Sequence, residues 1–408
     1  MRVALLSYRS KPYCGGQGVY VRHLSRALVD LGHSVEVLSG PPYPILDDGI
    51  ALTQIPSLDL YREPDPFRLP HFREFRSSID VLEFAAMCTA AFPEPLTFSL
   101  RARRHLATRV NDFDIVHDNQ SLGYGLLGME RLGLPVVATL HHPITVDRRF
   151  ELAVAPLRKQ ITMRRWYAFT RMQGRVARRL PAIATVSQSA YDDIVTDFGV
   201  EPSRLRVIPN GVDADVFAPS LETTRVPGRI VATASADVAL KGLVPLLEAL
   251  AKVRTERDAE LVLVGKPKSG GFAEQTLDRL GLRDAVQWVS DLSDDELADV
   301  LRSAEVAVVP SLYEGFSLPA IEAMACGTAL VATTAGALPE VIGPDGEAAL
   351  HVAPGDADAL ALAIGRILGD AVLRARLGVG GRARVLAKYT WHAAARATAE
   401  MYDEVRAC

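Results

Sequence analysis

The sequence predicts an α/β protein with two doubly wound domains, each built on a parallel sheet. Three observations carry this prediction. The first forty residues alternate strand, glycine-rich turn, helix and strand, and a second alternation of the same kind begins near residue 229. The chain has 408 residues, 49% of them hydrophobic, which is enough apolar mass for two cores.

The first domain opens with the apolar run 3–8, typical of a parallel strand buried on both faces. A turn with three glycines follows at 14–18, then a helical repeat to residue 31 and a strand at 34–38. Further strands are predicted at 115–117, 136–140 and 182–186. Residues 40 to about 113 are less regular, with seven prolines between Pro41 and Pro70, and predict long loops and short helices. Such loops shape a substrate site or are simply connections.

The second domain repeats the pattern. Strands are predicted at 229–233, 260–264, 286–289, 305–309 and 329–332, with helices such as 243–254 and 295–303 between them. Residues 356–408 are almost wholly helical in pattern. We therefore expect two Rossmann-like domains, 1–212 and 213–385, followed by a last segment, 386–408. Two such sheets joined by a short linker predict a deep cleft between their carboxyl ends.

Composition excludes several classes. Forty-five Lys+Arg against 49 Asp+Glu gives a net charge of −4, so no basic excess indicates nucleic acid. The four cysteines are far apart and predict neither a disulfide framework nor a zinc site, which favours a reducing cytoplasm. No segment has the length and apolarity of a signal peptide or a spanning helix. We expect a cytoplasmic protein, attached at most to the inner membrane surface.

Residues 310–327 are the most informative segment. They leave an apolar strand and enter a helix, with Pro319 near the first turn, where proline is tolerated. First-turn amides have no intrahelical acceptor and lie at the positive end of the helix dipole, so they can bind a phosphate. These amides belong to Gly315, Phe316, Ser317 and Leu318. Glu314 precedes the helix and Glu322 lies inside it. The alternative is a purely structural role, in which Glu322 lies on a solvated helix face and Glu314 pairs with the helix dipole.

The run P-S-L-Y-E-G-F-S-L-P-A-I-E-A-M-A-C-G, with its two glutamates, resembles the signature of retaining family 4 glycosyltransferases of the GT-B fold. Residues 15–21 with 32–35 resemble the family's opening unit, 209–213 its domain junction and 338–342 its late loop. Residues 389–391 with Tyr402 resemble the closing helix, which in this family crosses back to the first domain. The resemblance covers nearly the whole chain.

The resemblance implies a role for each matching residue. Glu314 would contact the donor sugar near its reacting carbon, Glu322 would hold the ribose hydroxyls, and Lys241 would grip the donor diphosphate. Gly16 would approach the donor phosphates, Gly15 the acceptor. The four first-turn amides would complete the donor site.

Two positions depart from the family pattern. An arginine usually precedes the lysine, whereas here the stretch 233–237 contains none. The family also often has H-x-H after the fourth strand, and Asn119 occupies the place of its second histidine, near the donor sugar. Asparagine can donate a hydrogen bond to a sugar hydroxyl but cannot titrate. Both departures leave the identity of the donor sugar open.

His141 follows the strand 136–140, and by family analogy it lines the acceptor pocket; a structural role is the alternative. The sequence shows no cluster with metal-ligand spacing, and Lys241 with the helix amides could replace Mg²⁺, so we expect no metal or other cofactor.

A basic stretch lies between residues 141 and 180, with ten Arg+Lys and two acidic residues. Its part from Arg164 to Arg179, together with Trp166, Tyr167 and Phe169, is compatible with docking on anionic lipid headgroups. The alternatives are a solvated helix face and an arginine that replaces the missing phosphate clamp.

The predicted activity is metal-independent, retaining transfer from a nucleoside-diphosphate sugar, with UDP favoured over GDP, to a hydroxyl of a small molecule, glycan or lipid. The departing diphosphate is expected to deprotonate the acceptor, because retaining enzymes of this family have no clear protein nucleophile. A non-catalytic protein that binds nucleotide sugars or glycans is the alternative. A dehydrogenase is disfavoured because residues 15–18 do not form G-x-G-x-x-G, and a phosphorylase-like enzyme would require a lysine that binds pyridoxal phosphate.

Overall fold

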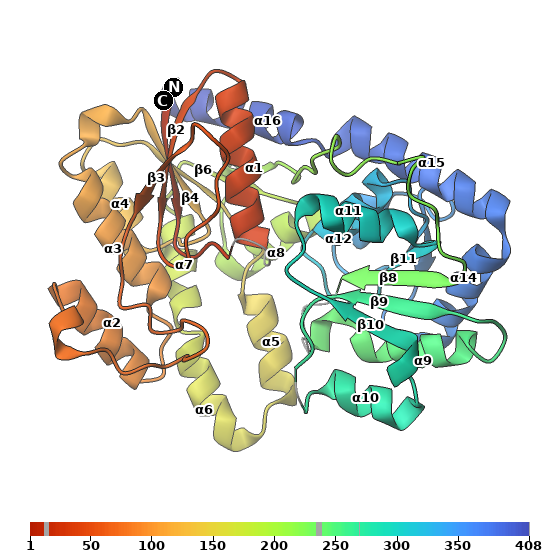
Figure 1. The fold of residues 1–408 in the computed structure, drawn as a ribbon. Helices are drawn as coiled ribbons and strands as arrows, with labels where there is room; N and C mark the ends of the chain where they lie inside the picture. The colour runs from red at the N-terminus through yellow and green to blue at the C-terminus, as the bar shows by residue number, and fades with distance from the viewer. Residues whose placement is uncertain (12–15, 234–238, 269, 408) are drawn as a thin grey trace. The chain divides into compact units, whose positions relative to one another are not determined.

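The computed structural model describes residues 1–11, 16–233, 239–268 and 270–407, which form two α/β units (Figure 1). Unit 1 comprises Met1–Ile208 and Ala394–Cys408, and unit 2 comprises Pro209–Ala393. The C-terminal helix therefore groups with the first unit. Gly15 and residues 234–237, where the family arginine would fall, lie outside the described residues.

Unit 1 is built on a parallel sheet with strand order β3-β2-β1-β4-β5-β6-β7. Its strands are β1 Arg2–Ser7, β2 Ser34–Ser39, β3 Ala51–Gln54, β4 Ile115–Asn119, β5 Val136–Thr139, β6 Ala182–Thr185 and β7 Leu205–Val207. The strand order reverses between β1 and β4, where Ser7 and Asn119 are paired in register. Ligands of doubly wound sheets bind at such a switch point, so these strand ends are candidate site positions.

Helices and short 3₁₀ turns connect the strands of unit 1. They are α1 Gly16–Asp30, α2 Ser78–Cys88, α3 Glu94–Leu106, α4 Tyr124–Glu130, α5 Thr145–Val154, α6 Leu157–Trp166, α7 Phe169–Ala177, α8 Gln188–Phe198, α16 Trp391–Ala407, and the turns Phe72–Glu74, Val110–Asp112 and Pro202–Arg204. The residues of β1 from Val3 to Leu6 are fully buried, as expected for a central strand covered on both faces.

Unit 2 has a parallel sheet with the order β10-β9-β8-β11-β12-β13. Its strands are β8 Arg229–Thr233, β9 Glu260–Val264, β10 Val286–Val289, β11 Val306–Val309, β12 Leu330–Thr333 and β13 Ala349–Val352. Its helices and turns are α9 Leu243–Val253, α10 Phe272–Leu280, α11 Asp294–Ser303, α12 Leu318–Ala325, α13 Leu338–Ile342, α14 Ala357–Gly369, α15 Ala371–Lys388, Ala239–Lys241 and Arg283–Ala285. The predicted α/β class with two parallel sheets is confirmed.

Three strands, β3, β7 and β13, are missing from the sequence prediction. All three lie at sheet edges, where a strand has only one neighbour. No residue of β3 is buried, and β7 buries only Leu205, so neither strand carries the continuous apolar run that marked the central strands.

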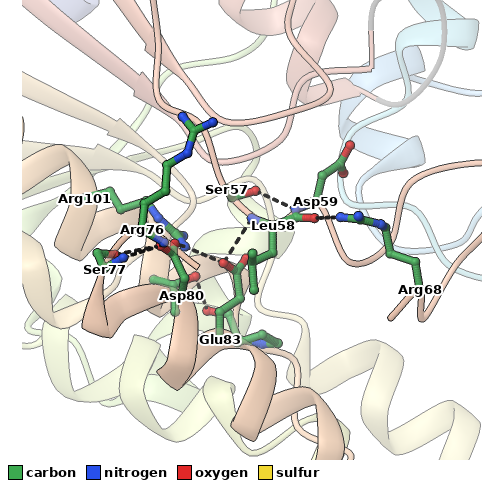
Figure 2. A network of polar contacts seen from close by, with 11 residues as sticks. Ser57, Leu58, Asp59, Arg68, Arg76, Ser77, Asp80, Glu83 and Arg101 are labelled. Atoms are coloured by element: carbon green, nitrogen blue, oxygen red, sulfur yellow. Dashed lines mark hydrogen bonds and ion pairs between the residues drawn. The ribbon is translucent and has the colours of Figure 1, made fainter. Parts of the chain in front are cut away.

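Polar contacts, and not strand pairing, hold the irregular stretch between β3 and α3 in place (Figure 2). Arg101 of α3 donates hydrogen bonds to Asp80 and Glu83 of α2, at 2.6 Å to Asp80. The backbone of Leu58 donates to Glu83 at 3.4 Å and accepts from Arg68 at 2.6 Å. These buried charges tie a loop and two helices together, which a reading of apolar periodicity cannot predict.

The aromatic residues of the suggested membrane face pack against other aromatic rings of unit 1, with Tyr167 buried and Trp166 and Phe169 half-buried. Trp166 contacts Tyr61 and Phe92, with ring centroids 5.5 and 5.0 Å apart, Phe169 contacts Phe92, and Tyr167 is buried. These rings are therefore largely occupied within the unit, and the exposed part of the suggested surface consists mainly of arginines such as Arg164, Arg165, Arg171 and Arg175. Within the described ranges, no helix is both long and apolar enough to span a membrane.

Candidate functional site

Two of the residues predicted separately, Lys241 and Glu314, form an ion pair in unit 2. Lys241 Nζ lies 2.9 Å from Oε2 and 3.1 Å from Oε1 of Glu314. Ser311 donates a hydrogen bond to the same Oε2 at 2.8 Å. The lysine side chain is 30% exposed and the glutamate side chain 12%, so an ammonium and a carboxylate stand together with limited access to water. An ammonium in this setting can neutralise a bound anion.

Two glycines allow the backbone to approach this pair. Gly242, at the start of α9, has φ +66°, and a Cβ there would lie 1.8 Å from the carbonyl oxygen of Pro310. Gly336 has φ +54°, and a Cβ there would lie 2.3 Å from the carbonyl oxygen of Glu314. The same oxygen accepts a hydrogen bond from Ala337 N at 2.8 Å, so the late loop fixes the backbone of the glutamate.

Helix α12 begins next to Glu314, as the sequence predicts. Ser317 is its N-cap, with φ +95°, and its Oγ accepts a hydrogen bond from Ala320 N at 3.4 Å. Pro319 lies in the first turn, and the ring of Phe316 packs edge-on against Tyr389 at 5.7 Å. Leu318 is the first helical residue and Ser317 the N-cap, so Gly315 and Phe316 precede the helix, and the prediction that their amides belong to its first turn is wrong. The positive end of the α12 dipole therefore lies close in sequence to Glu314.

Glu322 does not lie on a solvated face of α12. Its side chain is half-buried, and burial, followed by the negative charge of Asp294, raises the pKa of its carboxyl to about 7. A carboxyl group in this state changes charge near neutral pH and can accept two hydrogen bonds once ionised.

In unit 1 the structure brings Asn119 and His141 together. His141 Nε2 lies 2.8 Å from Asn119 Oδ1, and Asn119 Nδ2 donates to Gln17 O at 3.4 Å and to Ser7 Oγ at 3.5 Å. Asn119 is fully buried, and His141 is half-buried with the ring of Tyr20 edge-on at 4.7 Å. Burial lowers the pKa of His141 to about 3, so the ring is neutral at physiological pH.

A second buried network lies beside this pair. His117 Nε2 lies 2.7 Å from Thr139 Oγ1, His117 Nδ1 lies 2.6 Å from the hydroxyl of Tyr402, and Thr139 bonds the hydroxyl of Tyr20 at 2.7 Å. Burial lowers the pKa of His117 to about 3. The network ties α16 to β4, β5 and α1, and sequence reasoning missed it because His117 and Tyr402 are 285 residues apart.

The other predicted site residues are spread over the two units. Gly16 opens α1 and is exposed, next to Gln17, which accepts the hydrogen bond from Asn119. Gly315 lies between Glu314 and the N-cap of α12. Among the described residues, no three His, Cys, Asp or Glu side chains converge as a metal site.

Sequence comparison decides the family. The profile of glycosyltransferase family 4 matches residues 14–216, and that of glycosyl transferases group 1 matches residues 227–370. A protein of Mycolicibacterium hassiacum named MMP alpha-(1->4)-mannosyltransferase is 56% identical over 405 residues, covering 99% of this chain and 98% of its own. The chain belongs to glycosyltransferase family 4.

Other members and structures agree with this assignment. D-inositol 3-phosphate glycosyltransferase 2 of Catenulispora acidiphila is 31% identical to this glycosyltransferase, over 98% of this chain and 94% of the relative. Sucrose-phosphate synthase of Thermosynechococcus elongatus has the same fold, with a TM-score of 0.77, 24% identity and coverage of 100% and 99% of the two chains. WaaG, a glycosyltransferase involved in lipopolysaccharide biosynthesis, gives a TM-score of 0.70 at 17% identity, covering 98% and 99%. The GT-B fold expected from the resemblance is confirmed.

Proposed function

We propose that this glycosyltransferase moves a mannosyl unit from a nucleoside-diphosphate mannose to a hydroxyl of a glycan acceptor, with retention of configuration. The observation that carries the proposal is the 56% identity, over nearly the full length of both chains, to a protein named as an α-(1→4)-mannosyltransferase. An α linkage made from an α-linked nucleotide sugar is a retained linkage. UDP is the nucleotide that the sequence favours, and GDP is its competitor in the test below.

Lys241 is the residue proposed to stabilise the negative charge that develops on the leaving diphosphate. As the bond between the sugar C1 and the diphosphate oxygen breaks, negative charge grows on the leaving group. An ammonium that is already in place stabilises that charge without reorganisation. The hydrogen bonds that hold Lys241 to both oxygens of Glu314 support this role, because they fix the position of the ammonium before the donor binds.

In the proposed reaction, the new bond forms and the acceptor proton is transferred on the same face of the sugar. The acceptor oxygen bonds to C1 on the face that the diphosphate leaves, and its proton passes to the departing phosphate oxygen. Glu314 would lie beside C1 and stabilise the positive charge that develops on the ring. Glu322 would accept hydrogen bonds from the ribose diol, and the first turn of α12 would face the phosphates.

A single assay tests the proposal. The purified protein is incubated with UDP-mannose, GDP-mannose or UDP-glucose and a mannoside acceptor, and the product's anomeric configuration is read by ¹H NMR. We expect an α-linked product from one mannose nucleotide and an unchanged rate in EDTA, because Lys241 supplies the positive charge. A β-linked product would contradict retention. Binding of a nucleotide sugar with neither transfer nor hydrolysis would support the non-catalytic alternative.

A further inference from the structure

The hydrogen bond between Asn119 and His141 determines which nitrogen of the histidine carries its proton. Asn119 Nδ2 faces the carbonyl oxygen of Gln17, which can only accept, so the amide orientation is fixed. Asn119 Oδ1 then faces His141 Nε2 at 2.8 Å. Because an amide oxygen can only accept, Nε2 must be the protonated nitrogen of His141.

The second ring nitrogen is therefore a hydrogen-bond acceptor. A neutral imidazole with a proton on Nε2 has a lone pair on Nδ1. Within the described residues, the only hydrogen bond of the His141 side chain is the one to Asn119. The residue as a whole is half-buried. Its position is also restrained by the ring of Tyr20, edge-on at 4.7 Å from α1.

The neighbouring titratable groups leave this arrangement undisturbed. His117 on β4 is occupied by Thr139 and Tyr402. His142, the next residue, lies 3.0 Å from the carboxylate of Asp147 at the start of α5. Tyr20, on α1, directs its hydroxyl to Thr139. Among the described residues, no carboxylate forms a hydrogen bond or ion pair with the ring of His141, which contacts Asn119 and Tyr20, so its neutral form is the stable one.

We propose that Asn119 is a positioning residue, which holds His141 so that Nδ1 accepts a hydrogen bond from a hydroxyl of the sugar acceptor. This inference rests on the proposed glycosyl transfer. It replaces the expected direct contact of Asn119 with the donor sugar, because the asparagine is fully buried and its amide is bonded within the protein. A fixed lone pair selects a substrate that offers a hydroxyl at that point and orients its oxygen.

The tautomer can be measured without any substrate. In a long-range ¹H–¹⁵N correlation spectrum of histidine-labelled protein at pH 7.5, with His141→Gln used for assignment, we expect His141 to carry its proton on Nε2. A proton on Nδ1 would overturn the proposal. Because the free protein is measured, this result does not depend on whether the proposed transfer occurs.

Kinetics test the consequence for the substrate. Asn119→Leu should leave the tautomer unfixed and raise the acceptor KM about tenfold, the scale of one hydrogen bond, with the donor KM unchanged. Tyr402→Phe is the matched control: it removes a buried hydrogen bond from the neighbouring His117, and should leave both KM values as in the wild type. An acceptor KM raised equally by both variants would indicate general structural damage and overturn the specific role.

A third variant separates position from charge. Asn119→Asp keeps an acceptor oxygen opposite Nε2, but a carboxylate there raises the pKa of the imidazolium. We expect acceptor KM near the wild-type value at pH 8.5, rising as the pH falls and Nδ1 becomes protonated. In the wild type the acceptor KM should not rise in this way as the pH falls, because burial already holds the pKa of His141 near 3. Identical pH profiles for the two proteins would contradict the proposal.

Discussion

The carboxyl ends of the two sheets carry different kinds of polar chemistry. In unit 2, Lys241 and Glu314 form an ion pair, and burial brings the pKa of Glu322 to about 7. In unit 1, Asn119 and His141 are neutral partners, and burial keeps the histidine unprotonated. This contrast fits the proposed substrates: a diphosphate is charged throughout the reaction, whereas an acceptor hydroxyl is neutral until its proton leaves.

Charges in unit 1 are used for a different purpose. Arg101 lies between Asp80 and Glu83, and all three side chains are nearly inaccessible to solvent (Figure 2). Burial raises the pKa of Glu83, and Arg101 opposes this effect, so the acid depends on its partner to stay ionised. The buried ion pairs of Arg101 thus stabilise the loop region of unit 1, whereas the Lys241–Glu314 ion pair of unit 2 is proposed to serve the reaction.

The largest effect should come from breaking the buried pairs of unit 1. Arg101→Met leaves Asp80 and Glu83 without their cation, and removing one partner of a buried ion pair costs about 3–5 kcal/mol. We expect a loss of that size in the free energy of unfolding of unit 1, measured by urea denaturation. Arg104→Met, on the exposed side of the same helix, is the control and should change little. Equal stability of both variants would show that the buried pairs do not secure this region.

Removing the positive charge of Lys241 in unit 2 should lower the reaction rate and leave the stability of the fold unchanged. Lys241→Ala leaves only helix amides to stabilise the departing diphosphate, so turnover should fall by about 10²–10³, or ~2.7–4 kcal/mol in the barrier. Lys241→Arg should recover only part of the rate, since a planar guanidinium does not reproduce a compact ammonium. The measurement is kcat with saturating donor, beside a thermal melt that should be unchanged.

A second lysine of unit 2 provides the comparison. Lys252→Ala removes an exposed partner of Asp358 and should leave turnover unchanged. If Lys241→Ala keeps more than about a tenth of the wild-type rate, another cation neutralises the diphosphate, and the exposed arginines 164–179 would be the first to test.

How far the sequence could predict each region depends on the distance between interacting residues. Glu314, Glu322 and the start of α12 lie within one short segment after a strand, so their proximity follows from local structure. The contact of Glu314 with Lys241 spans 73 residues, and only the family resemblance assigned both residues to one donor site. The loop contacts in unit 1, such as that of Leu58 with Glu83, join residues with no shared periodicity, and no local pattern could reveal them.

Glu322 should give donor binding a pH dependence that His141 does not give to acceptor binding. The ribose diol needs the ionised carboxylate, and the pKa is raised to about 7, so affinity is lost as the pH falls through that value. The donor KM should rise about tenfold between pH 8 and pH 6, because the ionised fraction of a carboxyl group with a pKa near 7 falls about tenfold over that range. Glu322→Gln should show a raised donor KM with no pH dependence in this range. A donor KM of the wild type that does not change with pH would show that Glu322 does not bind the ribose.

Glu314 separates binding from chemistry within the same unit. Glu314→Gln removes the charge beside the reacting carbon but keeps a side chain of the same shape. It should lower kcat by more than it raises the donor KM, because the carboxylate acts on charge that develops in the transition state. Steady-state kinetics of the variant provide the test, and a change confined to KM would show that Glu314 binds the ground state only.

The smallest effect is expected at the buried neutral network of unit 1. The hydroxyl of Tyr402 has His117 Nδ1 as its one partner in the described chain, so it donates there, and the proton of His117 lies on Nε2, toward Thr139. Tyr402→Phe removes that donor and leaves a buried lone pair on Nδ1 unpaired, which costs about 1 kcal/mol. Because the bond joins α16 to β4, the loss should appear as faster hydrogen exchange in α16, with kcat unchanged. Unaltered exchange in α16 would mean that apolar packing alone holds this helix on unit 1, and a loss of kcat would mean that the two neutral networks of unit 1 act as one.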